Sequence, residues 1–272
     1  MSLLERVNRQ PVSPTGIDFS RVRMWTLNGW SKLYRQTVMF SEFDVLQLQS
    51  SFRSLCSNYA GRLIVHPKPV GIWFRVFVRM RHEFCRFNAE DAKSIDERRF
   101  QFFTSGLLST YTDGAMTKTL VFLSSSFDII RLRNHMMLRC VEFVTLTEYD
   151  DSDTMRRARS DFVNDDRVQL MLVTERFLFY RRREFQKITG IRHVLFYDLP
   201  TRPLLYAEVC NWVRDHRPRH RHNEDSATVR VLYCKYDMQR LRAVLGMERA
   251  DRVQVTLKDK NKYVLDPPLL EN

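Results

Sequence analysis

Arginines and aromatic residues alternate in the segment 175–183, whose sequence is ERFLFYRRR. Arginines contact phosphate groups, and exposed aromatic rings stack on nucleic-acid bases. The segment directly follows an apolar run at 169–174, and the carboxyl ends of parallel strands face the ligand crevice of an open sheet. Two interpretations remain open: a polyanion-binding surface, or a solvated loop with Phe177 and Phe179 packed inward. The candidate contacts are Arg176, Arg181, Arg182 and Arg183.

Two further basic segments are candidates for polyanion contact. Arg156 and Arg157 lie in a segment that opens with aspartates, an order of charges that suits a helix dipole. The alternative is a solvated helix face on which these arginines pair with the preceding aspartates. The segment 214–222 reads RDHRPRHRH, and its Arg217, Arg219 and Arg221 either clamp RNA or are simply exposed.

The sequence contains none of the familiar catalytic motifs. None of its eight glycines precedes a lysine, so it has no phosphate-binding loop, and no two glycines are spaced for a dinucleotide turn. Neither GxSxG nor HExxH occurs. The histidines of the 214–222 segment lie among arginines, whose charge repels a divalent cation. We therefore expect no catalytic residue, no metal and no cofactor.

Composition favours a folded, basic protein. The 272 residues include 44 Lys and Arg against 32 Asp and Glu, a net charge of +12, which favours a polyanionic partner such as RNA. No apolar run is long enough to span a membrane, and the first residues do not resemble a secretory signal. The five cysteines show no CxxC pair and sit among apolar neighbours, so we expect buried free thiols in a reducing, intracellular compartment.

Alternating strand and helix patterns position these residues. Five strands are predicted at 119–123, 141–146, 169–174, 193–197 and 228–233. Helices of about twelve residues separate them, with Ser126 and Thr201 as predicted N-caps and Gly246 ending the last helix. Strands that are apolar on both faces indicate a parallel sheet covered on both sides, a doubly wound α/β fold.

The first part of the chain holds fewer elements. Strands are predicted at 36–40 and 63–65, with a helix between them over 43–55, and an extended segment at 72–80 leads to an amphipathic helix over 97–111. These elements are too few for a domain of their own. We therefore expect residues 1–71 to be the end of a neighbouring lobe and residues 72–272 to form the doubly wound domain, so that the chain could be a fragment of a longer protein.

Many short blocks occur in a fixed order between about residue 18 and 250. The blocks are FSRVR at 19–23, LNGW at 27–30, YRQT at 34–37, NYAG at 58–61, RLRN at 131–134, TERF at 174–177, GIRH at 190–193 and KYD at 235–237. Together they resemble one known family, the digestive organ expansion factor family, also called U3 small nucleolar RNA-associated protein 25.

That family is similar to DEAD-box RNA helicases but degenerate. The resemblance implies a RecA-like doubly wound parallel sheet, the second helicase-type lobe, preceded by the end of a first RecA-like lobe. Ser41 would lie where that first lobe ends, and Thr174 and Glu175 would replace the Thr-Asp of a helicase. In the helix after Pro200, residues 206–213 read YAEVCNWV and hold no arginine before Arg214, so the resemblance implies that the arginine that reaches the ATP γ-phosphate in a helicase is missing.

The resemblance implies a non-catalytic, nucleolar ribosome biogenesis factor. It would act as a pseudo-helicase scaffold of the small-subunit processome in rRNA processing, contacting pre-18S rRNA in the context of U3 snoRNA and other processome proteins. No membrane and no nucleotide are expected as partners. One alternative is an active ATP-dependent RNA helicase whose catalytic lobe lies outside this chain, with ATP between Ser41 and Glu175. The other is a protein-only interaction module.

Overall fold

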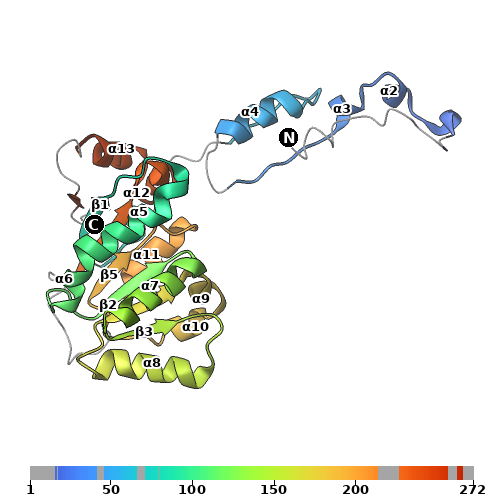
Figure 1. Cartoon of the computed structure of the whole chain (residues 1–272). Coiled ribbons are helices and arrows are strands. Elements are labelled where there is room, and N and C mark those ends of the chain that lie inside the picture. The colour runs from blue at the N-terminus through green and yellow to red at the C-terminus, as the bar shows by residue number, and fades with distance from the viewer. Residues whose placement is uncertain are drawn as a thin grey trace. The chain divides into compact units, whose positions relative to one another are not determined.

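The chain divides into two compact units, Met1–Lys68 and Pro69–Asn272. The computed structural model shown in Figure 1 describes residues 16, 18–41, 46–65, 71–78, 80–213, 227–256 and 262–265. The second unit contains the sheet and carries most of the predicted site residues.

A mixed sheet forms the centre of the second unit, with the strand order β3-β4-β2-β5-β6-β1-β7. The strands β1 to β6 pair parallel with one another, and β7 pairs antiparallel with β1 at one edge of the sheet. The strands are β1 (Arg81–Arg86), β2 (Thr119–Leu123), β3 (Phe143–Leu146), β4 (Leu170–Thr174), β5 (His193–Phe196), β6 (Thr228–Tyr233) and β7 (Lys262–Leu265). All five predicted strands are therefore confirmed.

Helices cover both faces of this sheet. One face packs against α5 (Ile95–Phe102), α6 (Leu108–Thr112) and α7 (Ser126–Leu138), with a π-helical turn at Phe103–Leu107 between the first two. The other face packs against α8 (Ser152–Asn164), α9 (Glu175–Tyr180), α10 (Arg182–Phe185), α11 (Pro203–Asn211), α12 (Met238–Leu245) and α13 (Met247–Thr256). This arrangement confirms the predicted α/β class, a doubly wound sheet of parallel strands covered by helices on both faces.

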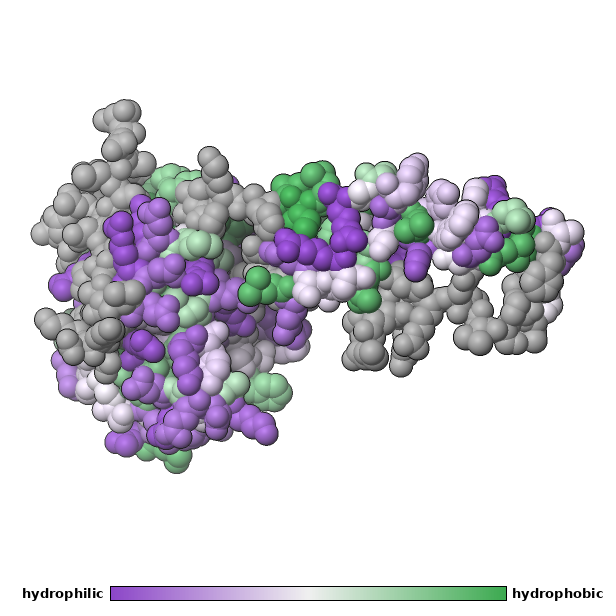
Figure 2. All heavy atoms as spheres, turned by 90° about the horizontal axis from the view of Figure 1, so that it is seen from above, coloured by the Kyte–Doolittle hydropathy of each residue, from purple (hydrophilic) through white to green (hydrophobic). Residues whose placement is uncertain are grey.

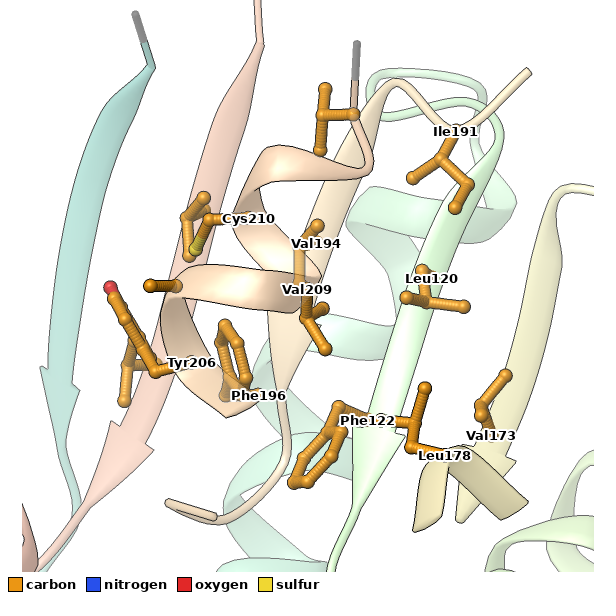
Figure 3. Packing of buried hydrophobic residues seen from close by; sticks show 14 of the residues in the cluster. Leu120, Phe122, Val173, Leu178, Ile191, Val194, Phe196, Tyr206, Val209 and Cys210 are labelled. Carbon is orange, nitrogen blue, oxygen red and sulfur yellow. The ribbon is translucent and has the colours of Figure 1, made fainter. Parts of the chain in front are cut away.

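Aromatic and branched side chains fill the space between the sheet and α11. Figure 3 shows Leu120, Phe122, Val194 and Phe196 from β2 and β5 facing the helix. Phe196 stacks on Tyr206 of α11 with the ring centroids 4.6 Å apart, and lies 5.3 Å from Phe122. All of these side chains are removed from water, which supplies the main stabilisation of the sandwich.

Short polar signals set the helix ends. The Ser125 hydroxyl accepts a hydrogen bond from the Phe127 amide, so the cap of α7 lies one residue before the predicted Ser126. Thr201 is not the cap of α11, because its amide and hydroxyl donate to Glu175 instead; Arg202 precedes the helix and Pro203 opens it. Gly246, at φ 85°, ends α12 as predicted.

The structure corrects three further expectations. The segment 72–80 is not continuously extended, since Trp73–Arg75 forms a 3-10 turn. The strand β1 follows it and was not predicted, because its sequence RHEFCR is mostly polar. The segment 175–183 is helical rather than a loop. Cys140 is exposed at a left-handed φ of 52°, whereas the other four cysteines are buried free thiols.

The first unit holds short helices and unpaired extended segments. The helices are α2 (Met24–Leu27), α3 (Ser31–Tyr34) and α4 (Leu46–Leu55), the last confirming the described part of the helix predicted over 43–55. The strands predicted at 36–40 and 63–65 are wrong, because within the described residues neither segment has a strand beside it. Val38, Phe40, Leu63 and Val65 are exposed, and Figure 2 shows hydrophobic side chains on the surface of this unit.

Candidate functional site

The carboxyl ends of β2, β4 and β5 define the crevice where an open parallel sheet binds its ligands. The chain leaves β2 toward α7 on one face of the sheet, but leaves β4 and β5 toward α9 and α11 on the other. Because neighbouring connections diverge here, this is a topological switch point. Ser124, Glu175 and Asp198 stand at or directly after the ends of these strands.

The chain's own carboxylates are hydrogen-bonded across this crevice. Asp198 accepts hydrogen bonds from the Ser124 amide at 2.8 Å and from the Ser124 hydroxyl. Glu175 accepts from the Thr201 amide at 2.9 Å and from the Thr201 hydroxyl. Burial raises the pKa of Asp198 to about 7, while the Arg99 charge and the Ser124 amide act in the opposite direction. Two acidic groups in this position disfavour a phosphate there.

A buried ion pair lies on the α5 and α7 side of the same edge. The Arg99 guanidinium is 3.6 Å from the Asp128 carboxylate, and both side chains are almost completely buried. The same guanidinium lies 5.7 Å from the ring of Tyr197, whose hydroxyl has no partner among the described residues. Burial lowers the pKa of Arg99, but Asp198, Asp237 and Asp128 raise it by more. The arginine thus remains charged and neutralises the acidic groups beside it.

The predicted arginines of α8 lie on its exposed surface. Arg156 pairs with Asp153 at 2.6 Å, as expected for a solvated helix face, and Arg157 is exposed. Met155, Ala158 and Phe162 form the buried stripe on the other side of the helix. The α8 arginines therefore point away from the core.

The predicted arginines of α9 and α10 differ from one another in their partners. Arg176 pairs with the buried carboxylate of Glu148 at 2.9 Å, and Arg182 pairs with Glu208 at 2.7 Å. Arg181 and Arg183 are exposed and have no ion-pair partner in the part of the chain that the structure describes.

An ion pair brings the two arginine groups to one region. Arg159 of α8 contacts Glu184 of α10 at 2.5 Å, so these helices are neighbours on the same face of the sheet, as Figure 1 also shows. The helices that carry the two predicted arginine groups, α8 and α10, thus lie side by side on the same face of the sheet. The predicted Arg217, Arg219 and Arg221, and the histidines between them, lie outside the described residues.

The aromatic residues of α9 divide between core and surface. Phe177 is buried, whereas Phe179 is exposed, so of the two interpretations left open, inward packing holds for Phe177 alone. Arg202, which the sequence did not single out, lies over the Phe179 ring at 4.3 Å. Its contact depends on a tertiary approach of the loop after β5, for which the sequence carries no local signal.

The described residues contain neither a candidate metal site nor a candidate membrane-spanning helix. Over these ranges, no group of three or more His, Cys, Asp or Glu residues could hold a metal ion. A helix long and apolar enough to cross a membrane is likewise missing from them.

Family models match nearly the whole chain. Residues 74–264 match the C-terminal domain of Utp25, and residues 1–63 match the NTP hydrolase-like domain of UTP25. The chain belongs to the Utp25 family. The resemblance predicted from the sequence is therefore confirmed.

Curated members of the Utp25 family match most of the chain but are much longer. It is 42% identical to the U3 small nucleolar RNA-associated protein 25 homolog of Xenopus tropicalis and 41% identical to that of Homo sapiens, each over 97% of this chain and 34% of the relative. The Schizosaccharomyces japonicus protein is 34% identical over 91% of this chain. The chain thus spans about a third of the length of these Utp25 relatives.

Solved structures similar to this Utp25 chain come from ATPase and helicase domains. The C-terminal domain of the DEAD-box protein Dbp5 aligns with a TM-score of 0.44 and 13% identity, over 67% of this chain and 88% of that one. The C-terminal part of the Fun30 ATPase domain aligns with a TM-score of 0.43 and 12% identity, over 63% and 56%. The fold assignment rests on the strand order and crossovers described above.

Proposed function

We propose that this chain is a non-catalytic ribosome biogenesis factor that contacts RNA and partner proteins as a pseudo-helicase scaffold of the small-subunit processome. It acts in rRNA processing toward pre-18S rRNA and 40S assembly, within a ribonucleoprotein that includes U3 snoRNA, and it works in the nucleolus. The names of its relatives support this context, because they are U3 small nucleolar RNA-associated proteins.

The observation that carries the RNA contact is the group of exposed arginines at α8 and α10, which are neighbouring helices on one face of the sheet. Arg157, Arg181 and Arg183 are exposed without an ion-pair partner among the described residues, and Arg156 adds a fourth guanidinium group. Unpaired cations gain more from a phosphate than paired ones, because no existing ion pair has to be broken. The net charge of +12 adds a long-range attraction for a polyanion.

The non-catalytic role is supported by the crevice itself. Glu175 and Asp198 hold hydrogen bonds to Thr201 and Ser124 at the switch point, which a nucleotide phosphate would have to displace. The helix after this crevice, α11, contains no arginine that could reach a γ-phosphate.

Crosslinking with charge-reversal variants tests the RNA contact. The tagged chain is purified from cells, and its crosslinked RNA and co-purified proteins are identified. Arg181→Glu with Arg183→Glu, and separately Arg156→Glu with Arg157→Glu, should reduce recovery of pre-18S RNA and U3 snoRNA. The matched control is Arg133→Glu with Arg139→Glu, which changes the net charge equally but lies at α7, on the other face of the sheet.

The outcomes separate the proposal from a protein-only interaction module. An equal loss of crosslinked RNA in all three variants would show that net charge alone explains the effect, and would contradict the assignment of these residues. Recovery of processome proteins without crosslinked RNA would favour the protein-only module. Direct phosphate contact also requires that affinity for RNA fall by orders of magnitude between low and moderate salt.

An active NTP-dependent helicase is the second candidate, since residues 1–63 match an NTP hydrolase-like domain. This function requires nucleotide binding by the complete protein. Titration of ATP into a full-length relative, followed by calorimetry, tests it: heat of binding supports the helicase, and its absence supports the non-catalytic scaffold.

We also propose that residues 1–71 are the end of a first RecA-like lobe and residues 72–272 the second lobe. The match of residues 1–63 to the NTP hydrolase-like domain supports this, as does the exposure of Val38 and Phe40 in a segment that is apolar on both faces. In a full-length relative, the matching segment should become protected from amide exchange. Exposure of that segment in the longer protein would overturn the assignment.

A further inference from the structure

We propose that Phe179 and Tyr180 of α9, with Arg202 and Arg176 against their rings, form a stacking platform for unpaired bases of single-stranded RNA. This inference rests on the proposed function, in which the chain contacts RNA, and it names the form of RNA that the face beside α10 selects. We call these four residues the stacking platform.

The rings of the stacking platform are presented to solvent by a short, well-anchored helix. Phe177 and Leu178 are buried on one side of α9, which turns Phe179 and Tyr180 outward with 53% and 62% of their surface exposed. The two exposed rings stand edge to face, 4.9 Å apart at 82°. Exposed neighbouring aromatics are costly in water, so a partner that covers them gains apolar contact.

A guanidinium group lies against each ring. Arg202 stands 4.3 Å from the centre of Phe179, and Arg176 stands 5.8 Å from the centre of Tyr180. The platform therefore runs cation, ring, ring, cation. Each flat apolar surface has a positive charge within about 6 Å, the reach of a cation–π contact.

Buried carboxylates hold both ends of the platform. Glu148 pairs with Arg176 at 2.9 Å and also accepts a hydrogen bond from the Thr174 hydroxyl at 3.1 Å. Glu175 fixes Thr201, the residue before Arg202, through its amide at 2.9 Å. Because these groups are positioned before any ligand arrives, little side-chain freedom is lost on binding.

The charge on the platform is only half compensated. Arg176 has its carboxylate, but Arg202 has no ion-pair partner in the described part of the chain, and exposed Arg181 follows Tyr180 directly. We therefore expect a partner that carries negative charge and also has a planar group that can stack on the rings of Phe179 and Tyr180.

Single-stranded RNA meets both requirements, since each nucleotide couples one flat base to one phosphate. A duplex offers the phosphates, but its base faces are already covered by their neighbours. An acidic peptide offers the carboxylates without a planar group beside each one. Stacking on exposed rings together with backbone cations is the usual way in which proteins bind unpaired strands.

Fluorescence anisotropy with the whole chain tests the platform. The probes are a labelled single-stranded RNA of about 12 nucleotides, its duplex, and a polyglutamate peptide as the acidic alternative. Phe179→Ala with Tyr180→Ala should weaken single-strand binding by about tenfold or more while leaving duplex binding unchanged. Tyr180→Phe keeps the ring and should bind normally. Phe127→Ala removes a more exposed ring from α7, on the other face, and serves as the control.

A stacking readout separates the platform from simple charge attraction. With 2-aminopurine in the single strand, binding should change its fluorescence in the wild-type chain and not in the double alanine variant. Equal binding of single strand by the double variant, with binding lost in Arg181→Glu with Arg183→Glu, would overturn the platform and leave the proposed function standing. Failure of the wild-type chain to bind either RNA would overturn both. Loss of polyglutamate binding alone would make the platform a protein site and overturn the inference.

Discussion

Two segments of similar composition adopt different structures in the two units of this chain: one forms a buried strand and the other is unpaired and exposed among the described residues. TLVFL at 119–123 forms β2, which lies between β4 and β5 with all five residues buried. QTVMF at 36–40 pairs with nothing in the described residues, and its Phe40 is 93% exposed. Strand preference alone therefore does not make a strand; it measures how well a segment fits beside neighbours that must be present.

Amide hydrogen exchange gives the largest expected contrast between the two units. The amides of β2 are hydrogen-bonded in the middle of the sheet, so they should exchange at least about a thousandfold more slowly than those of Val38 and Phe40, which have no backbone partner among the described residues. Mass spectrometry of peptic fragments measures both. Similar protection of the two segments would mean that 36–40 is paired in solution.

Truncation of a core ring should produce the next largest effect. Phe196 is fully buried and packs against Phe122 and Tyr206, so Phe196→Ala leaves a cavity. We expect a loss of about 3–5 kcal/mol in the free energy of unfolding. Urea unfolding followed by circular dichroism measures it, with Phe127→Ala, an exposed ring on α7, as the control. A loss below about 1 kcal/mol would show that the sheet and α11 can close the cavity.

The sequence predicted the centre of the sheet because its strands are apolar on both faces. It missed β1, whose sequence RHEFCR is polar, because tertiary partners neutralise those side chains. Glu83 and Arg230 form an ion pair at 2.9 Å, and the His82 Nδ1 lies 2.7 Å from the Tyr206 hydroxyl. Neither partner is near in sequence, so no local pattern reveals the strand.

The candidate site was predictable only as far as residue type and chain order allow. Following β4 into 175–183 located the arginines, because the carboxyl ends of parallel strands share one edge. That segment is helical because the Thr174 hydroxyl caps α9: it accepts a hydrogen bond from the Phe177 amide at 3.0 Å. The approach of Arg202 to Phe179 required the fold itself.

The buried histidine of β1 gives the second unit a pH dependence that exposed segments lack. Burial lowers the pKa of His82 to about 3, whereas an unfolded histidine titrates near about 6.5. Below about pH 6.5 the unfolded chain therefore binds a proton that the folded chain refuses, so stability falls as the pH falls. When the pH is lowered from about 7.5 to about 5, His82 should reduce the free energy of unfolding by about 2 kcal/mol.

Comparison with His82→Gln isolates this effect from other groups. The folded pKa of Asp198 is raised to about 7, so its contribution to the free energy of unfolding falls as the pH rises, the opposite trend to that of His82. This contribution is the same in wild type and variant and cancels in the comparison. The difference in unfolding free energy between wild type and variant should therefore shrink by about 2 kcal/mol at about pH 5. A constant difference across this range would show that the pKa of His82 is the same in the folded and unfolded chain.

The smallest expected effect is at Phe40, the counterpart of Phe196 in the first unit. Phe40→Ala removes the same number of atoms as Phe196→Ala, but from a ring that is already in water, so the free energy of unfolding should change by less than about 0.5 kcal/mol. The same urea titration measures it. A loss above about 1 kcal/mol would mean that a partner covers Phe40 in solution. If residues 1–71 are the end of a first lobe, as proposed above, the matching substitution in a full-length relative should become costly, because the rest of that lobe would cover the ring.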